Sequence, residues 1–182
     1  MKSPNASRSC WRNSDASVAQ VVRRIPRDCA AARLRGEIGT REALAYVGVQ
    51  VIAAIVGVLL AHAMFGLPLV QPGIHARTGM AQWLSEGVAT FGLVLTILLG
   101  LRHRPAAIPA LVASYIFAAY WFTASTSFAN PAVTIARSLT QTFAGIRPDD
   151  VAAFVLAQLV GAAIGLWVVE LFDARVRSSE PG

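Results

Sequence analysis

Charge is what this sequence has least of over most of its length. Only 14% of its 182 residues are charged, and the run from residue 105 to residue 136 holds no Lys, Arg, Asp or Glu. Together with 55% hydrophobic residues and a mean hydropathy of +0.54, this argues against an ordinary soluble domain. We therefore expect an all-α, polytopic membrane protein.

Reactive and metal-binding residues are also scarce. The two cysteines, Cys10 and Cys29, lie in the polar N-terminal part and give neither a metal-ligand spacing nor a disulfide framework. No nucleophile, paired carboxylates or phosphate loop is visible, which argues against an enzyme and against a cofactor. No metal site is expected either, because no shared metal spacing relates the three histidines, His62, His75 and His103. Residues 1–40 contain no apolar segment of the kind that a signal peptide needs.

The basic residues gather at the start of the chain. The net charge is +6, and nine of the sixteen Lys and Arg residues fall in the first 41 positions. Such a segment can bind nucleic acid, but here it precedes a membrane segment, so we interpret it as a cytoplasmic flank and expect no nucleic-acid partner. We expect three parts: a disordered leader at 1–35, a membrane domain at 36–174 and a cytoplasmic tail at 175–182.

Four apolar stretches are long enough to cross a bilayer, which takes about 20 helical residues. They cover residues 43–67, 82–101, 106–123 and 150–172. If the chain crosses at each one, the far side receives Arg77 and Arg147 from the loops between them. The near side receives Arg23, Arg24, Arg27, Arg33, Arg35, Arg41, Arg102, Arg104, Arg175 and Arg177. The positive-inside rule then places both termini in the cytoplasm, as for a protein of the plasma (inner) membrane.

A helix start lies inside the charge-free run of residues 105–136. Asn is a favoured N-cap residue and Pro is favoured at the first helical position, so Asn130-Pro131-Ala132 predicts a helix that begins there. A helix that begins within the bilayer must line a cavity or be buried in protein, because its first N–H groups find no partner in lipid. These N–H groups would then face whatever passes through. The alternative is a cap outside the membrane, which the charge-free flanks argue against.

An internal repeat relates the first and last apolar stretches. Residues 46–57 align with residues 154–165 at an offset of 108, with identities that include Gln50 with Gln158 and Gly57 with Gly165. The two copies run in opposite directions across the membrane, as in inverted-repeat transporters and channels. Coincidence within apolar sequence is the alternative. Position 22 is where the repeat would place a second helix start, but the chain has Val22 there and no Asn-Pro-Ala before Asn130.

From about Leu34 to Phe172 the chain resembles the major intrinsic protein family, the aquaporins and aquaglyceroporins. Residues 126–137, Thr-Ser-Phe-Ala-Asn-Pro-Ala-Val-Thr-Ile-Ala-Arg, match the second pore-motif loop of the family, and Glu86 matches its buried glutamate. The resemblance implies a partial aquaporin-like bundle with the third to sixth helices and one re-entrant half-helix, and a possible homotetramer. It also implies passive passage of water or small uncharged solutes, in contact with membrane lipid.

The resemblance also assigns site residues. The pore motif is Asn130, Pro131 and Ala132, and Glu86 supports the 124–130 loop; an interfacial glutamate is the alternative for Glu86. Close helix packing is expected at Gln50, Gly57, Gln158, Gly161 and Gly165, where small residues recur at four-residue spacing.

The resemblance also implies a selectivity filter, whose positions are carried over from the family by their spacing from Asn130. Its positions are Ala118, Ser127 and Val133, where water-selective relatives carry His and Arg at the first and last. Arg137 is one turn further along and is not expected to replace that Arg. We therefore expect a wide, neutral pore that suits polyols, urea or undissociated metalloid hydroxides better than water alone.

The first pore motif and the first two helices of the family have no counterpart in the chain. We interpret residues 1–33 as the product of a frameshift, a rearrangement or a misassigned start. An incomplete channel is the expected function, and a non-conducting remnant or interaction subunit is the alternative. An ion-coupled transporter is disfavoured, because no second intramembrane acid accompanies Glu86.

Overall fold

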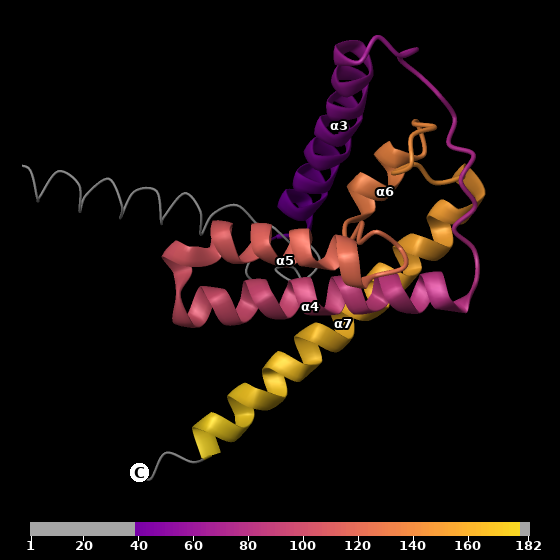
Figure 1. Ribbon diagram of the computed structural model, residues 1–182. Coiled ribbons are helices and arrows are strands. Elements are labelled where there is room, and N and C mark those ends of the chain that lie inside the picture. The colour runs from indigo at the N-terminus through magenta and orange to yellow at the C-terminus, as the bar shows by residue number, and fades with distance from the viewer. Residues whose placement is uncertain (1–38, 179–182) are drawn as a thin grey trace, which may run out of the picture.

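The computed structural model describes residues 39–178 and is helical there, with no strand in this part of the chain (Figure 1). The predicted leader at 1–35 and the end of the predicted tail at 175–182 lie outside the described residues. The helices are α3 (Thr40–Met64), α4 (Met80–His103), the 3-10 turn η1 (Pro105–Ala107), α5 (Ile108–Phe122), α6 (Pro131–Arg137) and α7 (Pro148–Ser178).

All four predicted spans are confirmed as helices that are long and apolar enough to cross a membrane. The first begins at Thr40 and ends at Met64, slightly earlier than predicted, because Gly66 takes a positive φ of 64° and Pro68 follows. The last continues past Phe172 as far as Ser178. The prediction of an all-α membrane protein is therefore confirmed.

The helices α4, α5 and α7 form the packed part of the molecule. In Figure 1, α4 and α5 lie side by side in opposite directions, joined by η1, and α7 crosses α4. A cluster of buried apolar side chains lies between α4 and α7: Val94, Leu98, Ala162, Leu166 and Val169.

Glycine sets how closely these helices approach. A Cβ atom on Gly161 would collide with the backbone carbonyl of Gly87, so α7 and α4 touch backbone to backbone there. A Cβ on Gly165 would lie 3.1 Å from Val94. A Cβ on Gly92 would meet the ring of Tyr115 on α5, whose hydroxyl donates to the Ala89 carbonyl at 2.9 Å. The small residues therefore allow close helix packing, as expected at Gly161 and Gly165.

Gly57 on α3 shows no such close contact within the described residues. No atom of residues 39–178 lies within 4 Å of the place where its Cβ would be, and the neighbouring Ala53 and Ala61 are exposed. The physical reason is the position of α3, which packs on α6 and stands apart from the α4–α7 pair (Figure 1). The two halves of the sequence repeat therefore lie in different surroundings, since Gly165 is buried and Gly57 is exposed.

The connection from α3 to α4 runs along the segment that follows α6. Gln71 N–H donates to the Leu139 carbonyl at 3.1 Å, Gly73 N–H donates to the Ser138 carbonyl at 2.8 Å, and Arg147 N–H donates to the His75 carbonyl at 2.8 Å. These hydrogen bonds join residues 65–79 to residues 138–147. They fix this long connection against the segment that leaves the C-terminal end of α6.

Candidate functional site

Asn130 begins α6, as the sequence predicts. Its backbone is extended, with φ −156° and ψ 122°, and its Oδ1 accepts a hydrogen bond from the N–H of Ala132 at 2.8 Å. Pro131 occupies the first helical position, where a missing N–H costs nothing. Thr134 adds to the turn by donating from both its N–H and its hydroxyl to the Asn130 carbonyl, each at 3.0 Å. The Asn130 side chain is thereby fixed in one orientation.

The loop before Asn130 has an unusual backbone. Thr126, Ser127 and Ala129 adopt left-handed conformations with φ of 60°, 46° and 48°. Each such conformation costs about 1 kcal/mol or more for a residue that carries a Cβ. The loop therefore needs external support to keep this shape.

Glu86 of α4 provides that support. Its side chain is fully buried, and its carboxylate accepts from the N–H of Phe128 at 3.2 Å and from the N–H of Ala129 at 2.5 Å. A third donor is Nε2 of Gln158 on α7, at 2.8 Å from Oε1. Hydrogen bonds to a buried carboxylate are stronger than those between neutral groups. This is the contact that the resemblance implies for Glu86.

Gln158 connects the two helices that hold the site. Its Nε2 also donates to the Thr134 hydroxyl of α6 at 2.8 Å, and its side chain is 1% exposed. The Oε1 atom of Gln158 has no hydrogen-bond partner within residues 39–172. The chain of contacts from Glu86 through Gln158 and Thr134 to Asn130 therefore joins α4, α7 and α6 in one polar network.

Arg77 was not predicted as a site residue, yet it is buried at the centre of the loops. Its donors each have a partner. The backbone N–H donates to Oδ2 of Asp150 at 2.8 Å, at the start of α7. The guanidinium donates to three carbonyls: Nε to Gly145 at 2.8 Å, Nη1 to Ser125 at 3.0 Å and Nη2 to Phe143 at 2.9 Å. One side chain thus ties the α3–α4 connection to the loops on both sides of α6.

The surroundings of Arg77 act on the pKa of its guanidinium in both directions. Burial lowers the pKa of the Arg77 guanidinium below its usual value, and the positive charge of Arg137 lowers this pKa further. The negative charge of Glu86 acts in the opposite direction. The guanidinium also packs on the ring of Phe128, with Cζ 5.0 Å from the ring centroid. Arg77 stays a cation, but one that its hydrogen bonds hold in place.

The predicted filter positions differ in exposure. Ala118 lies on an exposed part of α5, Ser127 is buried in the loop, and Val133 is half-buried on α6. The hydroxyl of Ser127 has no hydrogen-bond partner in the described part of the chain. The three positions come from α5, the loop and α6, and none of them lines the cavity beside the start of α6 described next.

A cavity of about 320 Å³ lies beside the start of α6, between α3, α4 and α7. Its walls are mainly apolar. Its polar members are Gln50, Thr90, Asn130 and Gln158, so the two glutamines of the sequence repeat face the same space. An apolar cavity with a few polar groups suits a small uncharged molecule.

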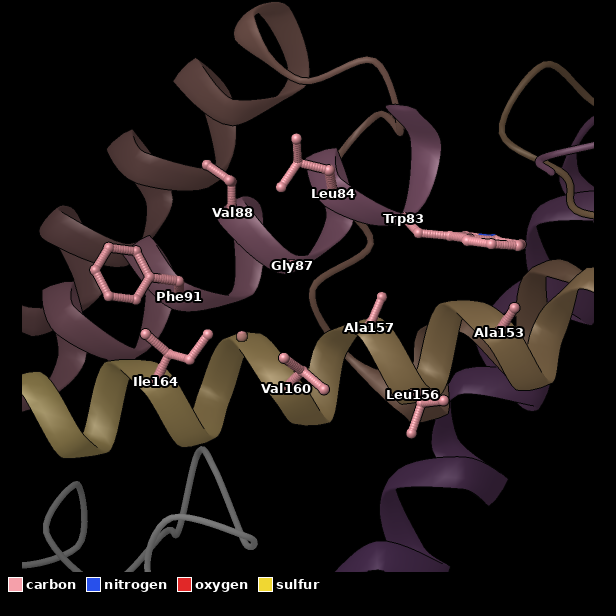
Figure 2. Close-up of a pocket in the computed structure, with 11 residues that line it drawn as sticks. Trp83, Leu84, Gly87, Val88, Phe91, Ala153, Leu156, Ala157, Val160 and Ile164 are labelled. Carbon is pink, nitrogen blue, oxygen red and sulfur yellow. The ribbon is translucent and has the colours of Figure 1, made fainter. Parts of the chain in front are cut away.

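A second, larger groove of about 610 Å³ lies along the α4–α7 crossing (Figure 2). Its lining is almost entirely apolar, with Leu84, Val88 and Phe91 on α4 facing Val160 and Ile164 on α7. Such a surface offers no hydrogen bonds to orient a polar solute. It therefore does not compete with the Asn130 cavity as the functional site.

The sequence is similar to that of a curated protein. It is 54% identical over 152 residues to the aquaglyceroporin AqpS of Rhizobium meliloti (strain 1021), a match that covers 81% of this chain. The chain spans 65% of the length of that relative. No family model matches the chain, and no solved structure matches it.

Proposed function

The chain belongs to the major intrinsic protein family, and on that premise we propose that residues 36–174 form a channel domain for passive passage of water or small uncharged solutes. The observation that carries the proposal is the fixed side chain of Asn130. Since Oδ1 is held by the Ala132 N–H, the Nδ2 group keeps its donors for another molecule. It has no hydrogen-bond partner within residues 39–172 and borders the cavity.

The charges around the motif favour an uncharged solute. Glu86, the carboxylate that the described residues place near it, is buried and already accepts hydrogen bonds from Phe128, Ala129 and Gln158. It is therefore not available to bind a cation. The N-terminus of a helix carries partial positive charge, which also disfavours a cation beside Asn130.

The filter positions support a solute larger than water. Ala118, Ser127 and Val133 have small or aliphatic side chains, which leave more room than aromatic or basic residues do. The relative from Rhizobium meliloti, an aquaglyceroporin, supports the same class of solute. We expect polyols such as glycerol, urea or undissociated metalloid hydroxides to pass, with no cofactor and no chemical reaction.

The setting of the channel is part of the same proposal. The protein is an integral membrane protein, and the distribution of arginines favours the plasma (inner) membrane with both termini in the cytoplasm. The exposed apolar residues of α3, α5 and α7 would contact lipid or a neighbouring subunit. A homotetramer is the assembly that we expect.

The test is solute flux into proteoliposomes, followed by light scattering after an osmotic step. The full chain should admit glycerol and urea faster than protein-free vesicles do. The matched variant Asn130→Asp keeps the oxygen that accepts from Ala132 but loses the amide donors, so its flux should fall by about tenfold. Orientation is checked separately by the access of a protease to a C-terminal tag.

Two results would contradict the proposal. Vesicles that hold folded protein but show no flux above the protein-free control would favour the non-conducting subunit instead. Uptake that depends on an ion gradient would favour a coupled transporter.

A further inference from the structure

The guanidinium of Arg77 holds the chain at both ends of α6. Ahead of the helix, Nη1 donates to the Ser125 carbonyl at 3.0 Å. After the helix, Nε donates to the Gly145 carbonyl at 2.8 Å and Nη2 donates to the Phe143 carbonyl at 2.9 Å. A helix of seven residues has about two turns and is not stable by itself. The position of α6 therefore depends on how its two ends are attached.

The contact at Ser125 lies just before the strained part of the loop. Ser125 is fully buried, and the two residues that follow it adopt left-handed conformations. The next two N–H groups donate to the carboxylate of Glu86. A cation that binds a carbonyl thus holds the loop before the strained pair, and an anion that binds N–H groups holds it after the pair. Strained residues persist where the structure around them fixes both sides, so release of the Arg77 side should let the pair relax.

Apolar packing keeps the guanidinium in this position. Its Cζ lies 5.0 Å from the centroid of the Phe128 ring, and that ring packs edge-on against Phe154 of α7 with a centroid distance of 5.4 Å. Phe128, Phe154 and Ile146 form a buried cluster. This cluster keeps water from one side of the guanidinium, and hydrogen bonds are stronger where water is excluded.

A glycine lets the segment that carries Arg77 lie close to α6. A Cβ atom on Gly73 would collide with the backbone carbonyl of Ile146, next to the Gly145 carbonyl that accepts from Nε. The Gly73 N–H also donates to the Ser138 carbonyl at 2.8 Å. A side chain at position 73 would therefore move this segment away from the end of α6 without any change to Arg77 itself.

Lysine could not take the place of Arg77. The three carbonyls are bound by three different nitrogens of one planar group, whereas lysine has a single ammonium group on a flexible stem. The requirement at position 77 is therefore for the shape of the guanidinium as well as for its charge.

We propose that Arg77 is a positioning residue for Asn130. By fixing both ends of α6, it holds the amide donors of Asn130 toward the cavity and so sets the preference of the channel for hydroxylated solutes over water. Glycerol gives up several hydrogen bonds to water when it enters the cavity, so its passage depends on a fixed donor more than the passage of a water molecule does. The inference rests on the proposed channel function.

The test is the ratio of glycerol permeability to water permeability for the full chain in proteoliposomes, after subtraction of the values for protein-free vesicles. A variant that only lowers the number of folded channels reduces both permeabilities together and leaves the ratio unchanged. Arg77→Gln should lower the ratio by about fivefold. Arg77→Lys keeps the charge but not the planar fork and should lower it by about threefold, which also tests the proposal if Arg77→Gln does not fold.

A second pair of variants leaves Arg77 in place. Gly73→Ala displaces the segment that carries it and should lower the ratio by about twofold. Its matched control is Gly57→Ala, whose methyl group meets no atom of the described residues and should leave the ratio unchanged. Arg147→Gln removes a half-exposed guanidinium near the same loops and should also leave the ratio unchanged.

The outcomes separate this inference from the proposed function. Folded Arg77→Gln and Arg77→Lys proteins that keep the original ratio would overturn it, because Arg77 would then have a structural role alone. If the unsubstituted chain shows no flux, the channel function fails, and hydrogen exchange in the same vesicles decides the positioning. Arg77→Gln should then raise exchange in residues 124–130 by about tenfold more than in α4 or α7, and equal changes would overturn the inference.

Discussion

The helices α3, α4 and α7 are all long and apolar, but they differ in packing. The helices α4 and α7 touch closely, whereas α3 is largely exposed. Where α7 crosses α4, a Cβ on Gly161 would meet the backbone of Gly87, and a buried apolar cluster continues along the contact. On α3, Gly57 meets no atom of another element, and large apolar residues such as Leu44, Ile52 and Leu60 are more than half exposed. Apolar sequence alone therefore does not fix the position of a helix in the bundle.

The comparison shows what the site depends on. Asn130 is held through Thr134 and Gln158 by α7, and its loop is held through Glu86 by α4. The helix α3 contributes to the wall of the cavity through Gln50, but it lacks the close backbone contact that joins α4 and α7. We expect changes in the α4–α7 pair to affect the site strongly and equivalent changes on α3 to affect it little.

The largest effect is expected from Gly161→Ala, with Gly57→Ala as the matched control. The added methyl group at position 161 collides with the Gly87 carbonyl, so the two helices must separate. The free energy of unfolding in detergent should fall by about 3 kcal/mol. At position 57 the methyl group meets nothing, and the stability should be unchanged or slightly higher. Equal losses for the two variants would show that α3 packs as closely as α7.

Glu86→Gln should have the next largest effect. The amide would turn its NH₂ group toward at least one N–H donor of Phe128, Ala129 or Gln158, which leaves buried donors unsatisfied. A loss of about 2 kcal/mol in the free energy of unfolding is expected, together with a large loss of solute flux. Glu170→Gln, on an exposed part of α7, is the control and should change neither.

His62→Ala tests the contacts that hold α3. The buried imidazole lies 2.8 Å from the Leu69 carbonyl at Nδ1 and 2.8 Å from the Thr140 hydroxyl at Nε2. Its loss should cost about 1 kcal/mol and raise hydrogen exchange at the end of α3, with no change near α7. The control is His75→Ala, whose side chain is exposed. Increased exchange across α4 as well would mean that α3 supports the whole bundle.

The smallest effect is expected from Arg147→Gln. Its own side chain is 42% exposed and its ion pair with Asp149 lies at the surface, whereas its second partner, Asp150, is 3% exposed and keeps the hydrogen bond from the Arg77 N–H after the substitution. Solvent-exposed pairs contribute about 0.5 kcal/mol or less. The midpoint of thermal unfolding should therefore shift little. Arg77→Gln should lower the midpoint clearly, because it releases two buried carbonyls and one partly buried carbonyl. A large shift for Arg147→Gln would give the surface pair a structural role.

Features with local causes could be predicted from the sequence. The four spans follow from continuous apolar composition, and the start of α6 follows from an N-cap residue before a proline. Glu86 is conspicuous as an acid inside an apolar run. These signals depend on residue type at one position or over one window.

Features that depend on distant backbone could not be predicted. Arg77 binds carbonyl groups of residues 48 to 68 positions away, and every residue has a carbonyl, so nothing in the sequence marks its partners. The sequence also gives no sign that Thr126 and Ala129 adopt left-handed backbone conformations, because glycine is the residue usually found in that conformation. Gly57 has the spacing of a packing residue, but spacing does not specify a partner.

The shape of the loop before Asn130 has a consequence for how the protein is made. The helix α6 has seven residues, too few to span a bilayer by itself, and the loop that leads into it holds three strained residues. This segment is therefore not stable in contact with lipid while the rest of the chain is still being synthesised. The loop can close only after α4 has brought in Glu86 and α7 has brought in Gln158, and α7 is synthesised after α6. The pore motif should be the final part of the domain to assemble, after all four spans have entered the membrane.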